Sequence, residues 1–259
     1  MVPPHDDRTP VVRANRDEKM YFYDRFAAQF ECAVNMYDTT RRLEVVFDEL
    51  LAGEPVRGSR LLDAGSGLGW FSERATVRGA RVVSLDVGVN ILRKVAEKCR
   101  TDLVAGSACE LNFRDASFDI VLSSEVIEHT PDPRRAVGEL CRVVKPGGLL
   151  VLTVPNRIWH FAAVAANALK IRPYEGYENW VGWWELQRWL REDGMTIEAY
   201  RGIHLFPFVL RVTHPLLRFL DRYGRSLGPV MVNIAVRARK GAITRFPQEP
   251  SKTGGDVPR

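Results

Sequence analysis

The chain has 259 residues, of which 46% are apolar and 27% are charged, and its formal net charge is +5. These proportions are typical of a globular protein and exclude a disordered, collagen-like or disulfide-scaffold class. The polar stretch 1–7 lacks the apolar core of a signal peptide, and no apolar run approaches the roughly 20 residues that span a bilayer. We therefore expect a cytoplasmic protein with one large domain or two small ones.

Strand-like and helix-like segments alternate between a flexible arm expected at 1–17 and a flexible tail expected at 241–259. Helices are expected first, between Glu18 and Leu51. The further elements, in chain order, are a strand at Arg60–Ala64, a helix at Trp70–Arg78, a strand at Arg81–Asp86, a helix at Asn90–Arg100, strands at Asp102–Ala105 and Phe118–Ser123, a helix at Pro133–Val144, a strand at Leu149–Val154, a helix at Glu185–Glu192, and strands at Met195–Arg201 and Met231–Val236. This alternation predicts an α/β fold in which helices cover both faces of a parallel sheet.

A glycine-rich turn with the pattern D-A-G-S-G-L-G at 63–69 joins the first of these strands to the next helix. Glycine lets the backbone approach a ligand, and the amides at a helix N-terminus attract anionic groups. The dinucleotide fingerprint G-x-G-x-x-G requires glycine where this chain has Trp70, so the pattern disfavours an NAD site. Asp86 ends the second strand, where a carboxylate can accept both ribose hydroxyls of an adenosine or, alternatively, cap the helix near Asn90.

Together with three later segments, this turn resembles the class I S-adenosylmethionine-dependent methyltransferases. Residues 106–113, 118–129 and 140–150 look like the adenine-side loop, the fourth-strand motif and the approach to the fifth strand of that family. The resemblance implies a Rossmann-like sheet of seven mostly parallel strands, the last antiparallel, sandwiched by helices. It implies one methyltransferase domain over 18–240, with its core motifs at 60–156.

The resemblance also implies S-adenosylmethionine as the cofactor and a role for each matching position. Asp63, Gly65, Ser66, Gly67 and Gly69 would surround the methionine part, Asp86 would bind the ribose, Val87, Ser107 and Ala108 would border the adenine, and Ser124 would belong to the same site.

An acidic cluster with a histidine, E-x-x-E-H at 125–129, stands at the carboxyl end of the fourth strand. This pattern resembles the ubiquinone-biosynthesis O-methyltransferases, and Arg42 matches an arginine that binds the cofactor's carboxylate in that family. His129, with Glu128, is a candidate catalytic base for a phenol or enol. Alternatively Glu125, Glu128 and His129 hold Mg²⁺, which the resemblance also implies. A third interpretation is that the cluster only orders its loop.

Two long connections depart from the regular alternation. The aromatic and apolar segment 157–184 is expected on the acceptor side, as a lid, as an amphipathic segment at a membrane surface, or as a surface helix packed on its own domain. The second connection, 203–228, lies within Arg201–Lys240, where eight basic residues face one acidic residue.

Four arginines of the second connection would share one face of an unbroken helix, although His214-Pro215 interrupts it. They are Arg211, Arg218, Arg222 and Arg225. This pattern favours either a reversible contact with an anionic membrane or a solvated face. Nucleic acid is not expected, because no recognition motif accompanies the basic residues.

The sequence therefore predicts an S-adenosylmethionine-dependent methyltransferase that acts on a small, lipophilic acceptor, at the oxygen of a phenol, enol or sugar hydroxyl. The alternatives are an N- or C-methyltransferase of another metabolite, and a cofactor-binding module without catalysis. The pattern indicates no particular oligomeric state.

Overall fold

The structure, a computed structural model, describes residues 19, 21, 24, 35–168 and 176–241. The arm expected at 1–17 and the tail expected at 241–259, apart from residue 241, lie outside the described residues, as do parts of the helices expected at 18–51. None of the helices within the described ranges is long and apolar enough to cross a membrane.

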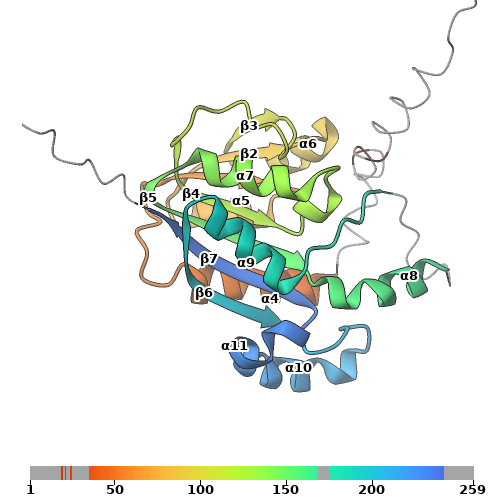
Figure 1. Cartoon of the computed structure of the whole chain (residues 1–259). Coiled ribbons are helices and arrows are strands. Elements are labelled where there is room, and N and C mark those ends of the chain that lie inside the picture. The colour runs from red at the N-terminus through yellow and green to blue at the C-terminus, as the bar shows by residue number, and fades with distance from the viewer. Residues whose placement is uncertain (1–18, 20, 22–23, 25–34, 169–175, 242–259) are drawn as a thin grey trace, which may run out of the picture.

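Within the described residues, seven strands form one sheet in the order β3-β2-β1-β4-β5-β7-β6 (Figure 1). They are β1 (Arg60–Ala64), β2 (Arg81–Asp86), β3 (Asp102–Ala105), β4 (Phe118–Ser124), β5 (Val144–Pro155), β6 (Met195–Ile203) and β7 (Asn233–Lys240). Strands β1 to β5 pair in parallel, and β7 runs antiparallel to both β5 and β6. The predicted Rossmann-like sheet with an antiparallel last strand is confirmed.

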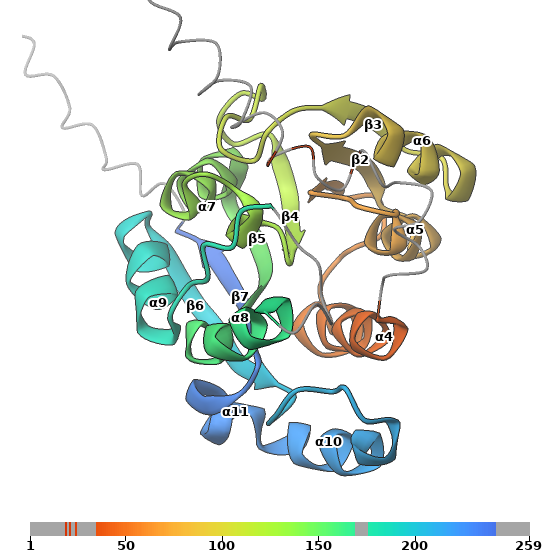
Figure 2. The same ribbon diagram turned by 90° about the vertical axis from the view of Figure 1, so that its right-hand side faces the viewer.

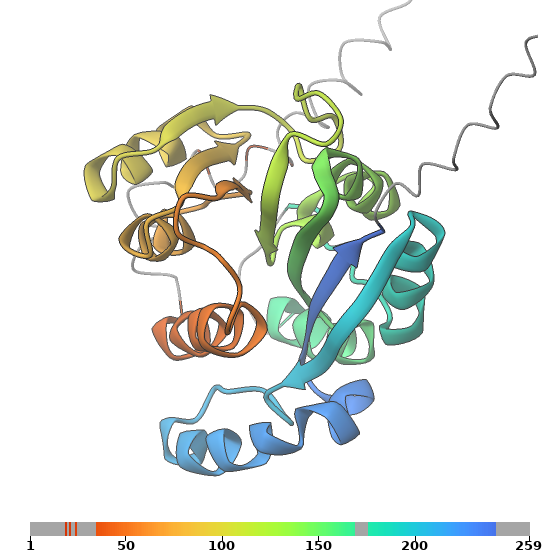
Figure 3. The same cartoon turned by 90° about the vertical axis from the view of Figure 1, so that its left-hand side faces the viewer.

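Helices lie on both faces of this sheet (Figures 2 and 3). The α-helices whose bounds lie in the described ranges are α4 (Met36–Glu44), α5 (Trp70–Val77), α6 (Val89–Lys98), α7 (Pro133–Val143), α8 (His160–Ala168), α9 (Trp183–Glu192), α10 (His214–Leu220) and α11 (Gly224–Leu227). A π-helical stretch, η1 (Val45–Leu50), extends α4, and the 3₁₀ turns are η2 (Ile127–His129), η3 (Arg157–Trp159), η4 (Arg211–Thr213), η5 (Asp221–Tyr223) and η6 (Gly228–Val230).

The core has two parts, one on each face of the sheet. Leu61 packs with η1 and α5, whereas its neighbour Leu62 packs with α7 and α9. Successive side chains of a strand point to opposite faces, so each central strand supplies both parts. Both residues are fully buried, and the central strands are therefore covered on both sides, as the sequence alternation predicts.

Strand β5 begins earlier and β7 ends later than the sequence predicts. Val144 already pairs with Phe118 of β4, so β5 starts before the glycines that were expected to precede it. At the other end, Arg239 of β7 donates to Glu198 of β6 at 2.5 Å and to Glu54 at 2.7 Å. Backbone pairing with β5 and β6 carries β7 to Lys240, beyond the predicted end at Val236, and these ion pairs lie along that extension.

The second long connection does not form one helix. It folds as η4, α10, η5 and α11 in succession, and Pro215 lies at the start of α10, where its fixed φ and missing amide favour a new helix. The four arginines therefore fall on different elements instead of one helical face. Arg218 reaches Glu44 at 2.9 Å, and α10 lies beside α4 (Figure 2).

Candidate active site

A cavity of about 550 Å³ opens at the carboxyl edge of the sheet. The turns after β1, β2, β3 and β4 all contribute to its wall, through residues 65–68, 86–87, 106–108 and 124–126. Ligands of open parallel sheets bind at this edge, next to the point where the strand order reverses. Strand β1 lies at that reversal here, because β2 and β4 flank it.

Two glycines of the turn, Gly65 and Gly67, stand where a side chain would either collide with a neighbour or fill part of the cavity. Gly65 has a φ of 78°, and a Cβ there would lie 2.3 Å from Val126 Cγ2. Gly67 has a φ of 49° and lines the cavity, and a Cβ there would meet no atom within 4 Å. Gly65 is therefore required by packing, whereas Gly67 keeps a part of the cavity open for a ligand.

Asp86 holds the glycine turn and faces the cavity. Its Oδ2 accepts a 3.0 Å hydrogen bond from the Gly67 amide, and its Oδ1 accepts one of 3.0 Å from the Gly88 amide. Burial raises the pKa of this carboxyl, and the amides act in the opposite direction. Asp24, not Asp86, accepts hydrogen bonds from the first amides of α6, so the capping alternative for Asp86 is wrong.

Arg42 brings a cation, whose side chain is 11% exposed, to the cavity wall from α4. Its Nε donates to Asp38 Oδ2 at 2.8 Å, and its Nη1 donates to Ser124 Oγ at 2.7 Å. Burial lowers the pKa of Arg42, but the carboxylates of Asp38, Glu125 and Glu128 together outweigh burial and raise it. The guanidinium therefore stays charged at the cavity wall, where it can pair with a carboxylate of a ligand.

Two of the residues predicted to bind the cofactor do not line the cavity. Asp63 is buried beneath the turn and accepts a 2.6 Å hydrogen bond from Ser72 Oγ, and burial raises its pKa to about 6. Gly69 is the N-cap of α5, where a Cβ would lie 3.3 Å from Val95. Both support the turn from behind. The remaining predicted cofactor residues line the cavity: Arg42, Gly65, Ser66, Gly67, Asp86, Val87, Ser107, Ala108 and Ser124.

His129 lines the cavity in an orientation suited to accept a proton. Its Nδ1 lies 2.9 Å from the carbonyl oxygen of Tyr177, and since a carbonyl can only accept, Nδ1 carries the hydrogen. In the neutral ring, Nε2 is then the basic nitrogen. Nε2 lies 3.7 Å from Glu128 Oε1, and Glu128 is only 1% exposed. A proton on Nε2 would thus be stabilised by a buried carboxylate.

The acidic cluster is not arranged as a metal site. The two carboxylate oxygens of Glu125 accept hydrogen bonds from Thr153 Oγ1 and Asn233 Nδ2, each at 2.9 Å. In the part of the chain that the structure describes, no group of three His, Cys, Asp or Glu side chains can hold a metal ion. The expected set of Glu125, Glu128 and His129 as ligands of Mg²⁺ is therefore not supported.

The other end of the cavity is apolar and aromatic. Its wall comes from the two long connections, through Trp159, Ala162, Ala163, Ala166, Trp180, Pro207, Phe208 and Val209. The sequence assigned the first connection, 157–184, to the acceptor side, whereas the place of Pro207, Phe208 and Val209 of the second connection in this wall was not predicted. Asp38 was missed, although it stands four residues before Arg42, a spacing that favours an ion pair on a helix.

Comparisons with known proteins agree on the class. Residues 62–152 match the family described as "Methyltransferase domain". A demethylmenaquinone methyltransferase of Clavibacter sepedonicus is 30% identical over 223 residues, which cover 74% of this chain and 90% of that protein. The chain therefore belongs to the S-adenosylmethionine-dependent methyltransferases.

Two further proteins are similar to this chain, one in sequence and one in fold. A ubiquinone biosynthesis O-methyltransferase of Nitrosococcus oceani is 31% identical over 166 residues, covering 60% of this chain and 70% of that protein. The solved structure of a methyltransferase of Thermotoga maritima, described as a possible histamine N-methyltransferase, superposes with a TM-score of 0.64 at 19% identity, covering 85% of this chain and all of that one. This second likeness concerns the fold alone.

Proposed function

We propose that the protein transfers the methyl group of S-adenosylmethionine to an oxygen of a small, lipophilic acceptor of the isoprenoid-quinone precursor class. Two relatives with substantial coverage carry names from ubiquinone and menaquinone synthesis. The acceptor end of the cavity, with Trp159, Trp180 and Phe208 in its wall, is suited to an aromatic ring with an apolar chain.

The cofactor end has the groups that S-adenosylmethionine requires. Arg42 would pair with its carboxylate, the opening beside Gly67 would admit the methionine part, and Asp86 would accept the ribose hydroxyls. Val87, Ser107 and Ala108 would border the adenine. When bound, the cofactor supplies an electrophilic methyl group, and the protein's task is to align the acceptor oxygen with it in a site that excludes water.

His129 would activate the acceptor. A phenol has a pKa of about 10, so it is mostly protonated and a poor nucleophile at neutral pH. His129 Nε2 would take the hydroxyl proton as the acceptor oxygen bonds to the methyl carbon and the carbon–sulfur bond breaks, which would leave S-adenosylhomocysteine, and Glu128 would stabilise the resulting imidazolium. The geometry that carries this proposal is the contact of Nδ1 with the Tyr177 carbonyl, which leaves Nε2 as the basic nitrogen beside Glu128.

Product formation from labelled cofactor and a detergent-dispersed isoprenoid phenol tests the proposal. His129→Ala should lower turnover by about 10²–10⁴-fold, while the affinity for S-adenosylhomocysteine stays near that of the wild type. A chelator should leave the wild-type rate unchanged. Full activity in both His129→Ala and Glu128→Gln would assign the cluster to loop structure.

The position of the new methyl group in the product separates this proposal from its alternatives. A methoxy product supports oxygen as the acceptor atom, whereas a new carbon–carbon or carbon–nitrogen bond supports the C- or N-methyltransferase. Binding of S-adenosylhomocysteine without turnover of any acceptor in a native lipid extract would indicate a cofactor-binding module.

We further propose that the enzyme works in the cytoplasm in reversible contact with an anionic membrane. Apolar side chains are exposed on the two segments that wall the acceptor end, among them Phe161 at 67% and Val212 at 83%. Arg211, Arg222 and Arg225 are exposed on the second segment and form no ion pair with any other described residue. Exposed apolar side chains, together with arginines that have no ion pair among the described residues, suit a membrane that carries acidic headgroups.

A further inference from the structure

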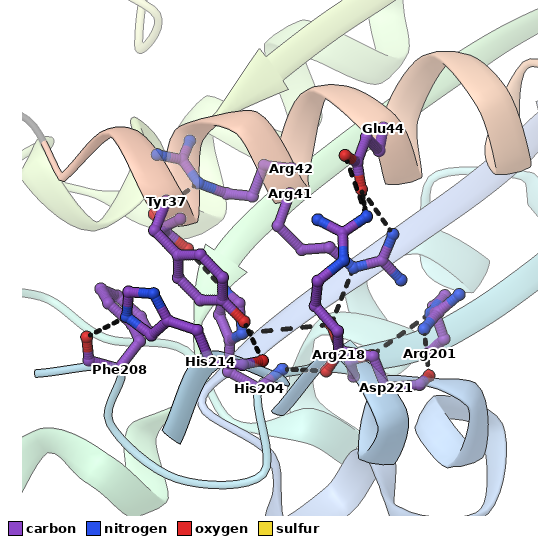
Figure 4. A network of polar contacts seen from close by, with 12 residues as sticks. Tyr37, Arg41, Arg42, Glu44, Arg201, His204, Phe208, His214, Arg218 and Asp221 are labelled. Atoms are coloured by element: carbon purple, nitrogen blue, oxygen red, sulfur yellow. Dashed lines mark hydrogen bonds and ion pairs between the residues drawn. The ribbon is translucent and has the colours of Figure 1, made fainter. Parts of the chain in front are cut away.

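A buried group of polar side chains connects the candidate cofactor arginine to the long connection 203–228 (Figure 4). His204, which is fully buried, lies at its centre. We propose that His204 is a positioning residue, which holds Asp38 and thereby aims the Arg42 guanidinium at the carboxylate of the cofactor. This proposal rests on the proposed cofactor role of Arg42.

Asp38 is shared between the histidine and the arginine. Asp38 Oδ2 accepts the 2.8 Å hydrogen bond from Arg42 Nε, and Asp38 Oδ1 lies 3.3 Å from His204 Nε2. Burial raises the pKa of Asp38, but Arg42 and His204 outweigh burial and lower it, so the carboxyl is ionised. Asp38 Oδ1 has no hydrogen-bond donor among the described residues, which is costly for a buried carboxylate oxygen, and the His204 imidazole is the group placed to supply one.

His204 is also bound to another residue of the long connection, Asp221. Its backbone amide donates a 2.7 Å hydrogen bond to Asp221 Oδ1, while Asp221 Oδ2 accepts one of 2.8 Å from Arg41 Nε. Adjacent arginines of α4 thus pair with two carboxylates, one on each side of the imidazole. His204 adopts a φ of 57°, a left-handed conformation that side-chain-bearing residues adopt where their surroundings impose it.

Ring contacts join the same histidine to the acceptor wall. The imidazole lies 4.8 Å from the Phe208 ring and 5.3 Å from the Tyr37 ring, centroid to centroid. Tyr37 in turn stacks on His214 at 3.5 Å, and Phe208 lines the cavity. One buried side chain therefore contacts both the residue that orients Arg42 and a residue of the acceptor wall.

Three substitutions at His204 distinguish the effect of its hydrogen-bond donor from the effect of its side-chain volume. Methionine and glutamine have similar shapes, but only glutamine keeps a nitrogen donor that can reach Asp38. His204→Met should weaken binding of S-adenosylhomocysteine by about tenfold or more, and His204→Gln should restore most of it. Should His204→Met fail to fold, His204→Asn replaces it, because asparagine tolerates this φ and is too short to reach Asp38.

A second ligand, which lacks the carboxylate, provides the control for the role of Arg42. 5′-Deoxy-5′-methylthioadenosine shares the adenosine of S-adenosylhomocysteine but lacks its carboxylate, so it cannot pair with Arg42. Calorimetric titration of His204→Met should show unchanged affinity for this ligand beside the loss for S-adenosylhomocysteine. Arg218→Gln, which breaks an ion pair between the long connection and α4 without touching Asp38, should leave both affinities within about twofold of the wild type.

Either of two results would overturn the proposal, because each indicates a role in packing alone. The first is an equal loss of affinity for both ligands in His204→Met. The second is an equal loss of affinity for S-adenosylhomocysteine in the methionine and glutamine variants. A folded His204→Met with wild-type affinity would overturn it too. If the wild type itself binds neither ligand, the proposed function fails, and that result is distinct from a failure at His204.

Discussion

Arg42 and Ser124 meet at the edge of the cavity, where Arg42 Nη1 donates a 2.7 Å hydrogen bond to Ser124 Oγ. The contact joins α4 to the end of β4 across a sequence separation of 82 residues. Ser124 Oγ lies 2.8 Å from Thr153 Oγ1, which donates to Glu125 at 2.9 Å. Helix α4, which lies outside the matched family segment 62–152, is thus joined by a network of hydrogen bonds to the carboxyl ends of β4 and β5.

Substitution of two glycines tests where the cofactor lies. Gly67→Val should abolish measurable binding of S-adenosylhomocysteine, because its branched side chain would fill the open part of the cavity. Gly147→Val is the matched control. Gly147 also has a positive φ, 77°, and open space around it, but it lies at the start of β5, away from the cavity. Calorimetry that shows similar losses in both variants would contradict the placement.

Asp63 makes the stability of the ligand-free protein depend on pH. Burial raises its pKa from 3.8 to about 6, so the folded state binds more protons than the unfolded state between these values. The contribution of Asp63 is therefore most favourable below pH 4 and is lost as the pH rises through 6, by up to about 3 kcal/mol.

Urea unfolding of Asp63→Asn and wild type, compared at each pH, isolates this contribution from that of other groups. The side chain of the variant stays neutral at every pH. The free energy of unfolding of the variant minus that of the wild type should therefore increase by up to about 3 kcal/mol between pH 4 and pH 7. A difference that does not change with pH would show that Asp63 is not the group responsible.

Flotation with anionic vesicles tests the membrane contact. Replacing Arg211, Arg222 and Arg225 with glutamine should weaken binding at low salt by roughly 100-fold, because each basic residue near an acidic surface contributes about 1 kcal/mol. A variant with Arg93, Arg100 and Arg188 replaced has the same net charge and should bind like the wild type. Wild-type protein that fails to float with the vesicles at low salt would contradict the proposal.

The parts of the fold that local patterns determine could be predicted closely. β1, β2 and β3 begin and end at the predicted residues, because each is a short apolar run bounded by a turn or a charge. Strand alternation also places Asp63 on the face of Leu61, toward α5 and Ser72, and not at the sheet edge. That signal was available in the sequence, and it agrees with the place of Asp63 outside the cavity wall.

The contacts of the 203–228 connection could not be predicted in this way. His204 meets Asp38 only after this connection packs against α4, and the two residues are far apart in the sequence. The basic character of Arg201–Lys240 suggested an external anionic partner, yet Arg201 and Arg218 form ion pairs with Glu49 and Glu44. Some of the excess basic residues therefore form ion pairs within the domain, and a count of charges in the sequence cannot show this.

The pH dependence of methyl transfer tests the central claim most directly, because it asks whether His129 removes the proton of the acceptor. We would measure single-turnover rates with saturating S-adenosylmethionine and an isoprenoid phenol, for the wild type and His129→Gln, from pH 7 to 10. The wild type should be faster by about 10²–10⁴-fold at pH 7. The gap should close toward pH 10, where a phenol with a pKa of about 10 ionises without a base. Equal rates at pH 7, or a gap that stays constant up to pH 10, would contradict the account.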